Sequence, residues 1–378
     1  MGNFIQLHFL TSYPPSNLNR DDLGRPKTAM LGGTQRLRVS SQSLKRAWRS
    51  SDVFEKSVGE ENKGVRTLRL AYERVYQPLC EAGVDEAKAL AAAIAVRGAF
   101  ETEKNEKPDK EPDGKAKPGK AGKTARKSED VSRSLQSSQL IFVSPQQLKL
   151  VDGFVQLVKK GETLNPETVK EKLLTNDGLG ADVALFGRMM SANQQFSVEA
   201  AAQVAHAITV HKITVEDDYF SAVDDLNVGG EDAGAGHIGT NEFAAGLYYL
   251  YVVIDQELLL QNLGSDKTLA EKAIRGLVEA ACTVSPTGKK ATFASFARAS
   301  YALAERGSQQ PRGLSTAFLR AVQGEDFLSG AIQVLKKTRD DMDKVYGPCA
   351  DKRMEFDVTA GTGSLKELVA FTAGGAQG

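Results

Sequence analysis

The sequence predicts an α+β protein in which a long helical segment interrupts a set of β-strands. Three observations support this prediction. Residues 3–12 alternate apolar and polar side chains, residues 64–100 and 145–174 have helical composition and spacing, and apolar strand patterning returns after residue 198. Strands and helices therefore follow each other in blocks, which favours an α+β fold over a regular doubly wound sheet.

Length and composition limit the possible protein classes. With 378 residues, the chain is long enough for a main domain and a large insertion. Its three cysteines, Cys80, Cys282 and Cys349, lie far apart, so we expect neither a disulfide framework nor a zinc site. The longest apolar run, residues 244–254, is about half of the roughly 20 residues that a membrane-spanning helix needs. We expect a cytoplasmic protein without a signal peptide, a lipid anchor or contact with a membrane.

The first elements are a strand, a turn-rich loop, and a strand that leads into a helix. Ile5, Leu7 and Phe9 share one face of the first strand. The loop from residue 13 to residue 33 contains prolines and a Gly-Gly pair. Residues 35–39 (QRLRV) then alternate as a half-buried strand.

The polar face of this second strand is expected to carry Arg36 and Arg38. A helix follows, capped by the hydroxyl of Ser40 or Ser41 and running to about Ser51.

A helical insertion occupies the next part of the chain. It begins at residues 64–100 and resumes at 145–160 and 166–174. Between these parts, residues 103–127 contain no large apolar side chain and many Lys, Pro and Gly residues. Such a segment cannot bury enough apolar surface to offset its ordering entropy, so we expect a flexible, mildly basic loop there.

The remainder of the chain returns to strands. Residues 212–255 read as an outgoing strand, a glycine-rich turn and a long returning strand, which together form a large hairpin projecting from a sheet. An amphipathic helix is expected at 269–281, a basic turn at 287–290, a strand at 291–304 and a final helix at 330–346.

Positive charge is concentrated in one short stretch. The whole chain has 48 basic and 48 acidic residues, yet residues 18–49 contain eight basic residues against two acidic ones. On the expected helix, Leu44 and Trp48 lie on the anchoring face, and Gln42, Lys45, Arg46 and Arg49 follow the opposite face. A solvated helix face is the usual explanation for such charges. The preceding basic strand and the helix-start hydroxyls and amides favour phosphate binding instead.

Catalytic motifs are absent from the sequence. The four histidines have no metal-site or triad spacing around them. Paired aspartates could hold Mg²⁺ at a phosphodiester in a nuclease, although such pairs more often form turns or solvated faces. The aspartates concerned are Asp21, Asp22, Asp217, Asp218, Asp224 and Asp225. Two alternatives to a non-catalytic, phosphate-binding protein therefore stay open: a metal-dependent endoribonuclease and a plain assembly protein without nucleic acid.

Two further groups of side chains could contact bases. Tyr248, Tyr249 and Tyr251 could stack on bases, but their apolar neighbours favour core packing. Met189, beside Arg188 in a polar segment, could wedge against a base or fill a gap in the core.

At this level of detail the sequence resembles a known family. Several segments, which occur in the same order along the chain, resemble the CasC family. They are NFIQLHFLTSYPPSNLNRDD (3–22), GGTQRLRVSSQSLKRAWR (32–49), ALFGRM, AHAITVH, DDYFSAVDDL, GHIGTNEFAAGLYYLY and the basic turn before ATFASF. That family is the crRNA-binding backbone subunit of the type I-E CRISPR Cascade complex. The likeness covers most of the chain.

The resemblance implies a modified RRM-like (ferredoxin-like) palm, an inserted helical finger lobe and a projecting β-hairpin thumb. The palm would comprise residues 1–63 and 198–378, with the thumb at about 213–247. The finger lobe would comprise residues 64–197, with the basic loop at 103–127.

The resemblance also implies a role and partners. Copies of the chain would polymerise along a crRNA without catalysis, metal or cofactor, with other Cascade subunits and the target DNA strand as further partners. A neighbouring copy's thumb would flip out bases at intervals. The resemblance implies RNA contacts by Lys27, Ser40, Gln42, Lys45, Arg49, Met189, Tyr219, Phe220 and Ser221. The basic residues Arg20, Arg38, Arg46, Arg188, Lys289 and Lys290 complete the predicted RNA-binding set.

Overall fold

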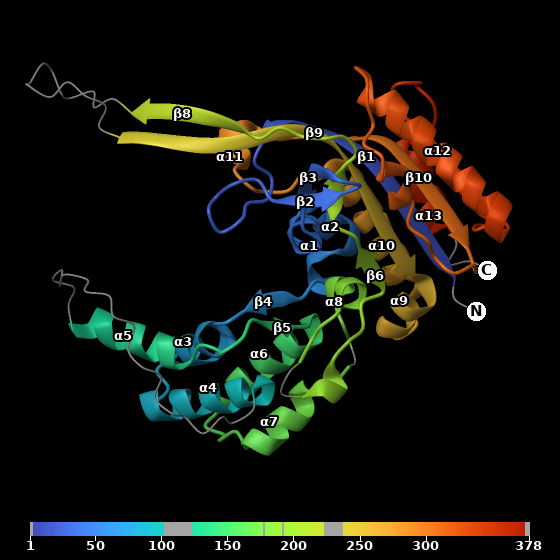
Figure 1. Ribbon diagram of the computed structural model, residues 1–378. Coiled ribbons are helices and arrows are strands. Elements are labelled where there is room, and N and C mark those ends of the chain that lie inside the picture. The colour runs from blue at the N-terminus through green and yellow to red at the C-terminus, as the bar shows by residue number, and fades with distance from the viewer. Residues whose placement is uncertain (1–2, 102–122, 177, 191–192, 223–236, 375–378) are drawn as a thin grey trace, which may run out of the picture. The chain divides into compact units, whose positions relative to one another are not determined.

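The computed structural model describes residues 3–101, 123–176, 178–190, 193–222 and 237–374 (Figure 1). The chain forms two compact units. Unit 1 consists of Met1–Glu60, Ala201–Gln261 and Asp266–Gly378, and unit 2 of Glu61–Ala200 and Asn262–Ser265. The main divisions thus fall at 60/61 and 200/201, compared with predicted divisions at 63/64 and 197/198.

Unit 1 is built around one large antiparallel sheet, which confirms the α+β class. Its strands are β1 (Phe4–Ser16), β2 (Thr28–Leu31), β3 (Thr34–Val39), β6 (Ala202–Val204), β7 (Ala207–Thr209), β8 (Glu216–Ala222), β9 (His237–Asp255), β10 (Ala299–Gly307) and β11 (Lys352–Asp357). Its helices are α1 (Ser41–Arg49), α2 (Asp52–Val58), α9 (Gln256–Asn262, ending in unit 2), α10 (Lys267–Thr283), α11 (Lys290–Phe293), η4 (Ser315–Phe318), α12 (Phe327–Tyr346) and α13 (Leu365–Ala373).

The strand order is β11-β10-β1-β9-β7-β3-β2, with β6 and β8 also paired to β9. Strand β1 lies in the interior of the sheet, antiparallel to both β9 and β10, with Leu7 opposite Val252 and Ala304. All six residues from Ile5 to Leu10 are buried. Continuous burial, in place of alternation, is typical of a strand that is covered on both faces.

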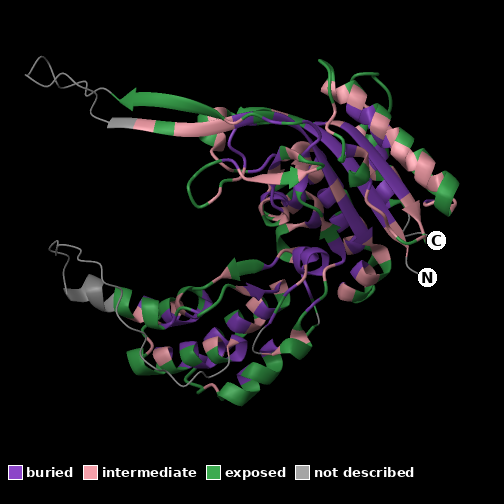
Figure 2. Cartoon of the chain, viewed as in Figure 1, coloured by how far each residue is buried: buried purple, intermediate pink, exposed green. Residues whose placement is uncertain are grey.

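Helix α12 covers one face of this sheet and α10 lies on the other (Figure 1). Ala331, Ile332 and Leu335 of α12 pack on Tyr249 of β9 and Tyr301 of β10. In Figure 2 the central strands are accordingly almost entirely in the colour of buried residues. Side chains of the sheet face are therefore enclosed by protein.

This enclosure settles the role of the tyrosines in β9. Tyr248 and Tyr249 are 5% and 2% exposed, and the Tyr251 hydroxyl donates to Gln6 Oε1 at 2.8 Å. The expectation of core packing, and not base stacking, is confirmed.

Strands β8 and β9 form the hairpin that the sequence placed at about 213–247. Every residue of β8 is exposed, and Glu216 to Ala222 pair in register with Phe243 to His237. The same strand β9 continues into the sheet. The glycine-rich turn at the hairpin tip, including Asp224 and Asp225, lies outside the described residues.

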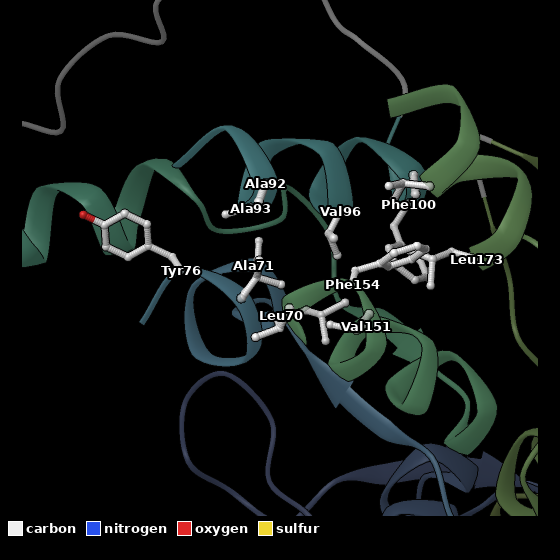
Figure 3. Close-up of a cluster of buried hydrophobic side chains, with 14 of the residues drawn as sticks. Leu70, Ala71, Tyr76, Ala92, Ala93, Val96, Phe100, Val151, Phe154 and Leu173 are labelled. Carbon is white, nitrogen blue, oxygen red and sulfur yellow. The ribbon is translucent and has the colours of Figure 1, made fainter. Parts of the chain in front are cut away.

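Unit 2 is a helical unit with its own core. Its elements are η1 (Glu60–Asn62, beginning in unit 1), β4 (Val65–Thr67), η2 (Tyr72–Tyr76), α3 (Gln77–Glu81), α4 (Glu86–Phe100), α5 (Lys123–Ser134), β5 (Ile141–Val143), α6 (Pro145–Lys159), α7 (Pro166–Leu173), α8 (Ala181–Phe186) and η3 (Gln194–Phe196). Figure 3 shows the core, where Val96 and Phe100 of α4 meet Phe154 of α6 and Leu173 of α7.

Within the described ranges of the whole chain, no helix is long and apolar enough to cross a membrane.

Several element boundaries differ from those predicted. The expected strand at 291–304 is β10 from residue 299 onward, because 290–293 form the short helix α11. Strand β11 and helix α13 were not predicted. The last five residues of the predicted loop 103–127 belong to α5, whose Lys, Ala and Arg residues favour a helix; residues 103–122 lie outside the described ranges.

A buried ionic cluster fixes the segment after β10 onto the sheet. Glu305 of β10 is fully buried, and it accepts hydrogen bonds from His8 Nε2 (3.2 Å), Arg312 Nη2 (3.0 Å) and Arg353 Nε (2.6 Å). Burial alone would raise the pKa of Glu305, but the bonds from His8 and Arg312 and the Arg312 charge outweigh it and hold the pKa far below its usual range. Burial lowers the pKa of His8, so its neutral ring accepts from the Tyr249 hydroxyl at Nδ1.

We predict that Glu305→Gln destabilises unit 1 by about 3 kcal/mol at pH 7. It removes the one fully buried counter-charge of Arg312 and Arg353 and leaves them only Asp343. A carboxylate with a lowered pKa stabilises the fold above its unfolded pKa of about 4.3, and this contribution is lost as the pH falls below that value. The difference between the two proteins should therefore shrink in acid.

The measurement is denaturant unfolding followed by the fluorescence of Trp48, the single tryptophan, which is 1% exposed in unit 1. Asp341→Asn is the matched control, because Asp341 pairs with Lys337 on the exposed side of α12, where solvent screens the pair, and should change the stability little. Equal stability of the Glu305→Gln and Asp341→Asn proteins would contradict the assignment.

Candidate nucleic-acid interface

The loop between β1 and β2 is fixed by hydrogen bonds, although the sequence shows only turn residues there. Asn17 is fully buried and its Nδ2 donates to Gly24 O (3.0 Å) and Glu242 O (2.9 Å). Asp21 closes a turn by accepting from the amides of Leu23 and Arg25 at 3.0 and 2.9 Å. The loop thus has one conformation tied to the base of the hairpin.

Lys27 is the last residue of this loop, and two backbone hydrogen bonds fix its position. Its amide donates to Asn19 O, and its carbonyl accepts from the Arg38 amide, both at 2.8 Å. Asn19 Oδ1 in turn accepts from the Ser40 amide at 2.9 Å. Lys27, Arg38 and Ser40, which the sequence predicted as separate contacts, are therefore neighbours at the start of α1.

His206 completes this cluster and was not predicted. Its Nδ1 lies 3.2 Å from both Arg38 Nη1 and the Ser41 amide, and it accepts from these donors. Partial burial and the charges of Arg38 and Lys27 lower its pKa, which keeps the ring neutral. Only the pairing of β3 with β7, where Val39 faces Ala207, brings His206 here, so no local sequence signal could have revealed it.

Helix α1 has the two faces that the sequence predicted. Leu44, Ala47 and Trp48 are buried, whereas Gln42 and Arg46 are exposed. The other two members of the polar stripe, Lys45 and Arg49, are partly exposed. Four adjacent polar side chains thus lie along one side of a firmly anchored helix.

The start of the helix differs from the open anion site that we expected. Ser40 is the N-cap, and its Oγ accepts from the Ser43 amide at 3.4 Å. The Ser41 amide already donates a hydrogen bond to His206 Nδ1. Ser40 is buried, so this end of α1 presents chiefly the partly exposed cations Lys27 and Arg38.

Arg36 corrects the interpretation of β3. The sequence placed it beside Arg38 on a polar face, but Arg36 is fully buried. Its guanidinium donates to Thr209 O and Phe318 O, each at 3.0 Å, because η4 covers this part of the strand. Burial lowers its pKa, and its charge serves the fold.

The predicted thumb residues lie on β8. Tyr219 is 66% and Phe220 38% exposed, and Ser221 is exposed. The Phe220 ring lies against its cross-strand partner Gly239, where an added Cβ would come within 2.4 Å of the ring.

The basic turn lies at the base of the hairpin. Lys289 Nζ donates to Asn241 of β9, and the Lys290 Nζ lies 4.2 Å from the ring centroid of Phe296. Arg20, in the loop that Gly288 contacts, is exposed.

Arg188 and Met189 belong to unit 2. The structure corrects the predicted role of Arg188 in binding RNA. Arg188 is 4% exposed, and it donates to Gln147 Oε1, Thr175 O, Asn176 Oδ1 and Phe196 O at 3.1–3.4 Å. A guanidinium enclosed by four acceptors holds the unit together and is not presented to RNA. Met189 is 89% exposed, whereas Met190 packs in the core of unit 2.

The described aspartates of the nuclease alternative lie in two places, the β1–β2 loop and strand β8. Asp21 is engaged in its own turn, and the amide of Arg25 is the main cause of its lowered pKa. Asp217 and Asp218 lie on the exposed strand β8. Across the part of the chain that the structure describes, no group of three or more His, Cys, Asp or Glu side chains is placed to hold a metal ion.

Comparisons with known proteins agree with this arrangement. The chain is similar to a chain of a structure described as "CRISPR RNA-guided surveillance complex, pre-nicking", with 29% identity, a TM-score of 0.80, and coverage of 99% of this chain and 100% of the other. A chain of a second "CRISPR RNA-guided surveillance complex" has 25% identity, a TM-score of 0.68, and coverage of 97% and 99%. No match was found among curated proteins.

The profile of the CT1975-like protein family matches residues 5–371, which is nearly the whole chain. The expected resemblance to a subunit of a CRISPR surveillance complex is thereby confirmed. The chain belongs to the CT1975-like family of CRISPR-associated proteins.

Proposed function

We propose that this protein is a non-catalytic backbone subunit of a type I-E CRISPR Cascade complex, which polymerises along a crRNA and holds its phosphate backbone. The surface formed by Lys27, Arg38, Ser40 and the polar stripe of α1, here called the β3–α1 surface, carries this proposal. A row of cations and hydrogen-bond donors on a rigid support suits a repeated anion. The similarity to chains of RNA-guided complexes supports RNA as that anion.

The topology supports an RRM-like palm in unit 1. Strands β10, β1, β9 and β7 lie side by side, each antiparallel to its neighbour, and α10 connects β9 to β10. In terms of chain order this is 4-1-3-2, the order of a ferredoxin-like sheet. Its face is enclosed by α12, so RNA would bind at the β3–α1 surface and not on the sheet.

The hairpin is proposed as a thumb. Exposed aromatic side chains on a projecting two-stranded ribbon can enter a groove of a second copy and displace a base. Tyr219 and Phe220 would make this contact, and the exposed Met189 would press on bases at the finger. Guide segments between displaced bases would remain free to pair with target DNA, so base pairing and not the protein would read the sequence.

We expect Lys45→Glu/Arg49→Glu to weaken binding of guide RNA at least tenfold and to abolish assembly on it, because two cations of the stripe become repulsive to phosphate. The measurement is size-exclusion chromatography with absorbance at two wavelengths, together with an RNA titration. Lys352→Glu/Lys366→Glu, at exposed positions of β11 and α13, has the same change in net charge and should assemble normally. Equal loss in both double variants would mean that only net charge matters.

Phe220→Ala should change the chemical reactivity of the displaced guide nucleotides in the assembled particle, because the side chain that separates them is gone. Asp217→Ala, on the same exposed strand, should leave the reactivity pattern intact. An unaltered pattern in Phe220→Ala would remove Phe220 from the role of base-displacing residue.

Purified protein incubated with labelled guide RNA should leave it intact with Mg²⁺ and with a chelator alike. The Asp21 carboxylate, one of the candidate metal ligands, is committed to its turn. Cleavage that needs Mg²⁺ and disappears in Asp217→Asn/Asp218→Asn would establish the endoribonuclease instead.

A further inference from the structure

A single large aromatic side chain stands out from the palm next to the basic turn. Phe296 is 70% exposed, and Lys290 Nζ lies 4.2 Å from its ring centroid. Its neighbours Ser295 and Ala299 are buried, whereas Arg298 is exposed. The chain therefore alternates here, and it directs an aromatic ring and a guanidinium to the solvent side.

The loop that carries Phe296 is anchored at both ends. The Ala297 amide donates to Ser285 Oγ at 2.9 Å, which closes the loop. Phe293 packs near Phe243 of the hairpin, with ring centroids 6.1 Å apart. An added Cβ on Gly288 would come within 2.2 Å of Leu18 O, so the loop touches the β1–β2 loop closely.

The backbone of this loop is strained. Lys289 and Ala294 have φ values of 42° and 47°, in the left-handed region that residues with a Cβ rarely adopt. Such strain persists only where surrounding contacts impose it, and it gathers at functional positions. Ala294 lies two residues before Phe296, at the end of α11.

The loop also adjoins the β3–α1 surface. A depression of about 430 Å³ is lined by residues of three segments: the β1–β2 loop from Leu18 to Gly24, Ser43 of α1, and Thr287 and Gly288 of this loop. Asp21 and Asp22 are also in the lining, and the Asp21 carboxylate is held within its own turn. A strand of RNA held along α1 would thus run close to the loop that presents Phe296.

We propose that Phe296 is a stacking platform for an unpaired nucleobase of a bound single strand, with Lys290 behind the ring and Arg298 toward the adjacent phosphate. The inference rests on the proposed RNA-binding function and adds a base contact to it. A single nucleic-acid strand presents the faces of its bases and its phosphates. An exposed aromatic ring can stack on a base, and the cations beside the ring can pair with a phosphate. A purely apolar protein partner would not need two cations around one ring.

The test uses the full chain and fluorescent single-stranded oligouridine, with binding measured by anisotropy over a range of salt concentrations. Phe296→Ala should raise the Kd about fivefold or more, which is the lower bound for one base stacked on an aromatic side chain. The dependence of log K on log salt should not change, because no charge is removed. Phe296→Trp should restore binding, and Lys290→Ala should make the salt dependence less steep.

Tyr346→Ala is the matched control, because Tyr346 is 81% exposed at the end of α12. Unchanged affinity in Phe296→Ala, or an equal loss in Tyr346→Ala, would overturn the inference. A Phe296→Ala protein that binds RNA normally but fails to join other subunits would overturn it in favour of a protein contact. A parallel titration with oligothymidine assigns the platform to guide RNA if only oligouridine binding falls, and to a DNA strand if only oligothymidine binding falls.

The outcome is separable from that for the proposed function. If wild-type protein binds neither oligonucleotide, the proposed function fails. If wild-type binds, Lys45→Glu/Arg49→Glu does not, and Phe296→Ala binds as wild-type does, only the stacking platform fails.

Discussion

Strand β9 is the element on which the rest of unit 1 depends. Its 19 residues pair with β1, β6, β7 and β8, so the same strand forms the middle of the sheet and one arm of the hairpin. At the point of transition, Asn241 is bound by Lys289 and Glu242 by Asn17. The hairpin base is therefore joined by hydrogen bonds to the β1–β2 loop and to the basic turn at 287–290.

Enclosure of the sheet limits where RNA would bind under the proposed function. The buried carboxylate of Glu305 and its two arginines hold the segment after β10 over the sheet, and α12 packs beside it. Open RNA-binding sheets stack bases on exposed aromatic residues, and here those positions are interior. Under the proposed function, affinity would come from edges and helix faces, which is where Lys27, Arg38 and the stripe of α1 lie.

Local sequence patterns predicted those helices and strands that are determined by interactions between residues near each other in the sequence. The caps and apolar spacing of α6 and α7 gave their bounds within one residue, and both faces of α1 agreed with its periodicity. Long-range contacts could not be inferred. Arg36 can be buried because Thr209 and Phe318, 173 and 282 residues further on, supply carbonyl acceptors. The position of His206 depends on strand pairing. A charged side chain reads as exposed until its distant acceptors are known.

The most direct test of the account is the reactivity of individual lysines in the protein bound to guide RNA. The chain alone and the chain with RNA are acetylated briefly, and each site is quantified by mass spectrometry. Lys27 and Lys45 should lose reactivity when RNA binds, whereas Lys352 and Lys366 should keep theirs. Bound RNA that leaves Lys27 and Lys45 as reactive as before would contradict the claim that the β3–α1 surface holds its backbone.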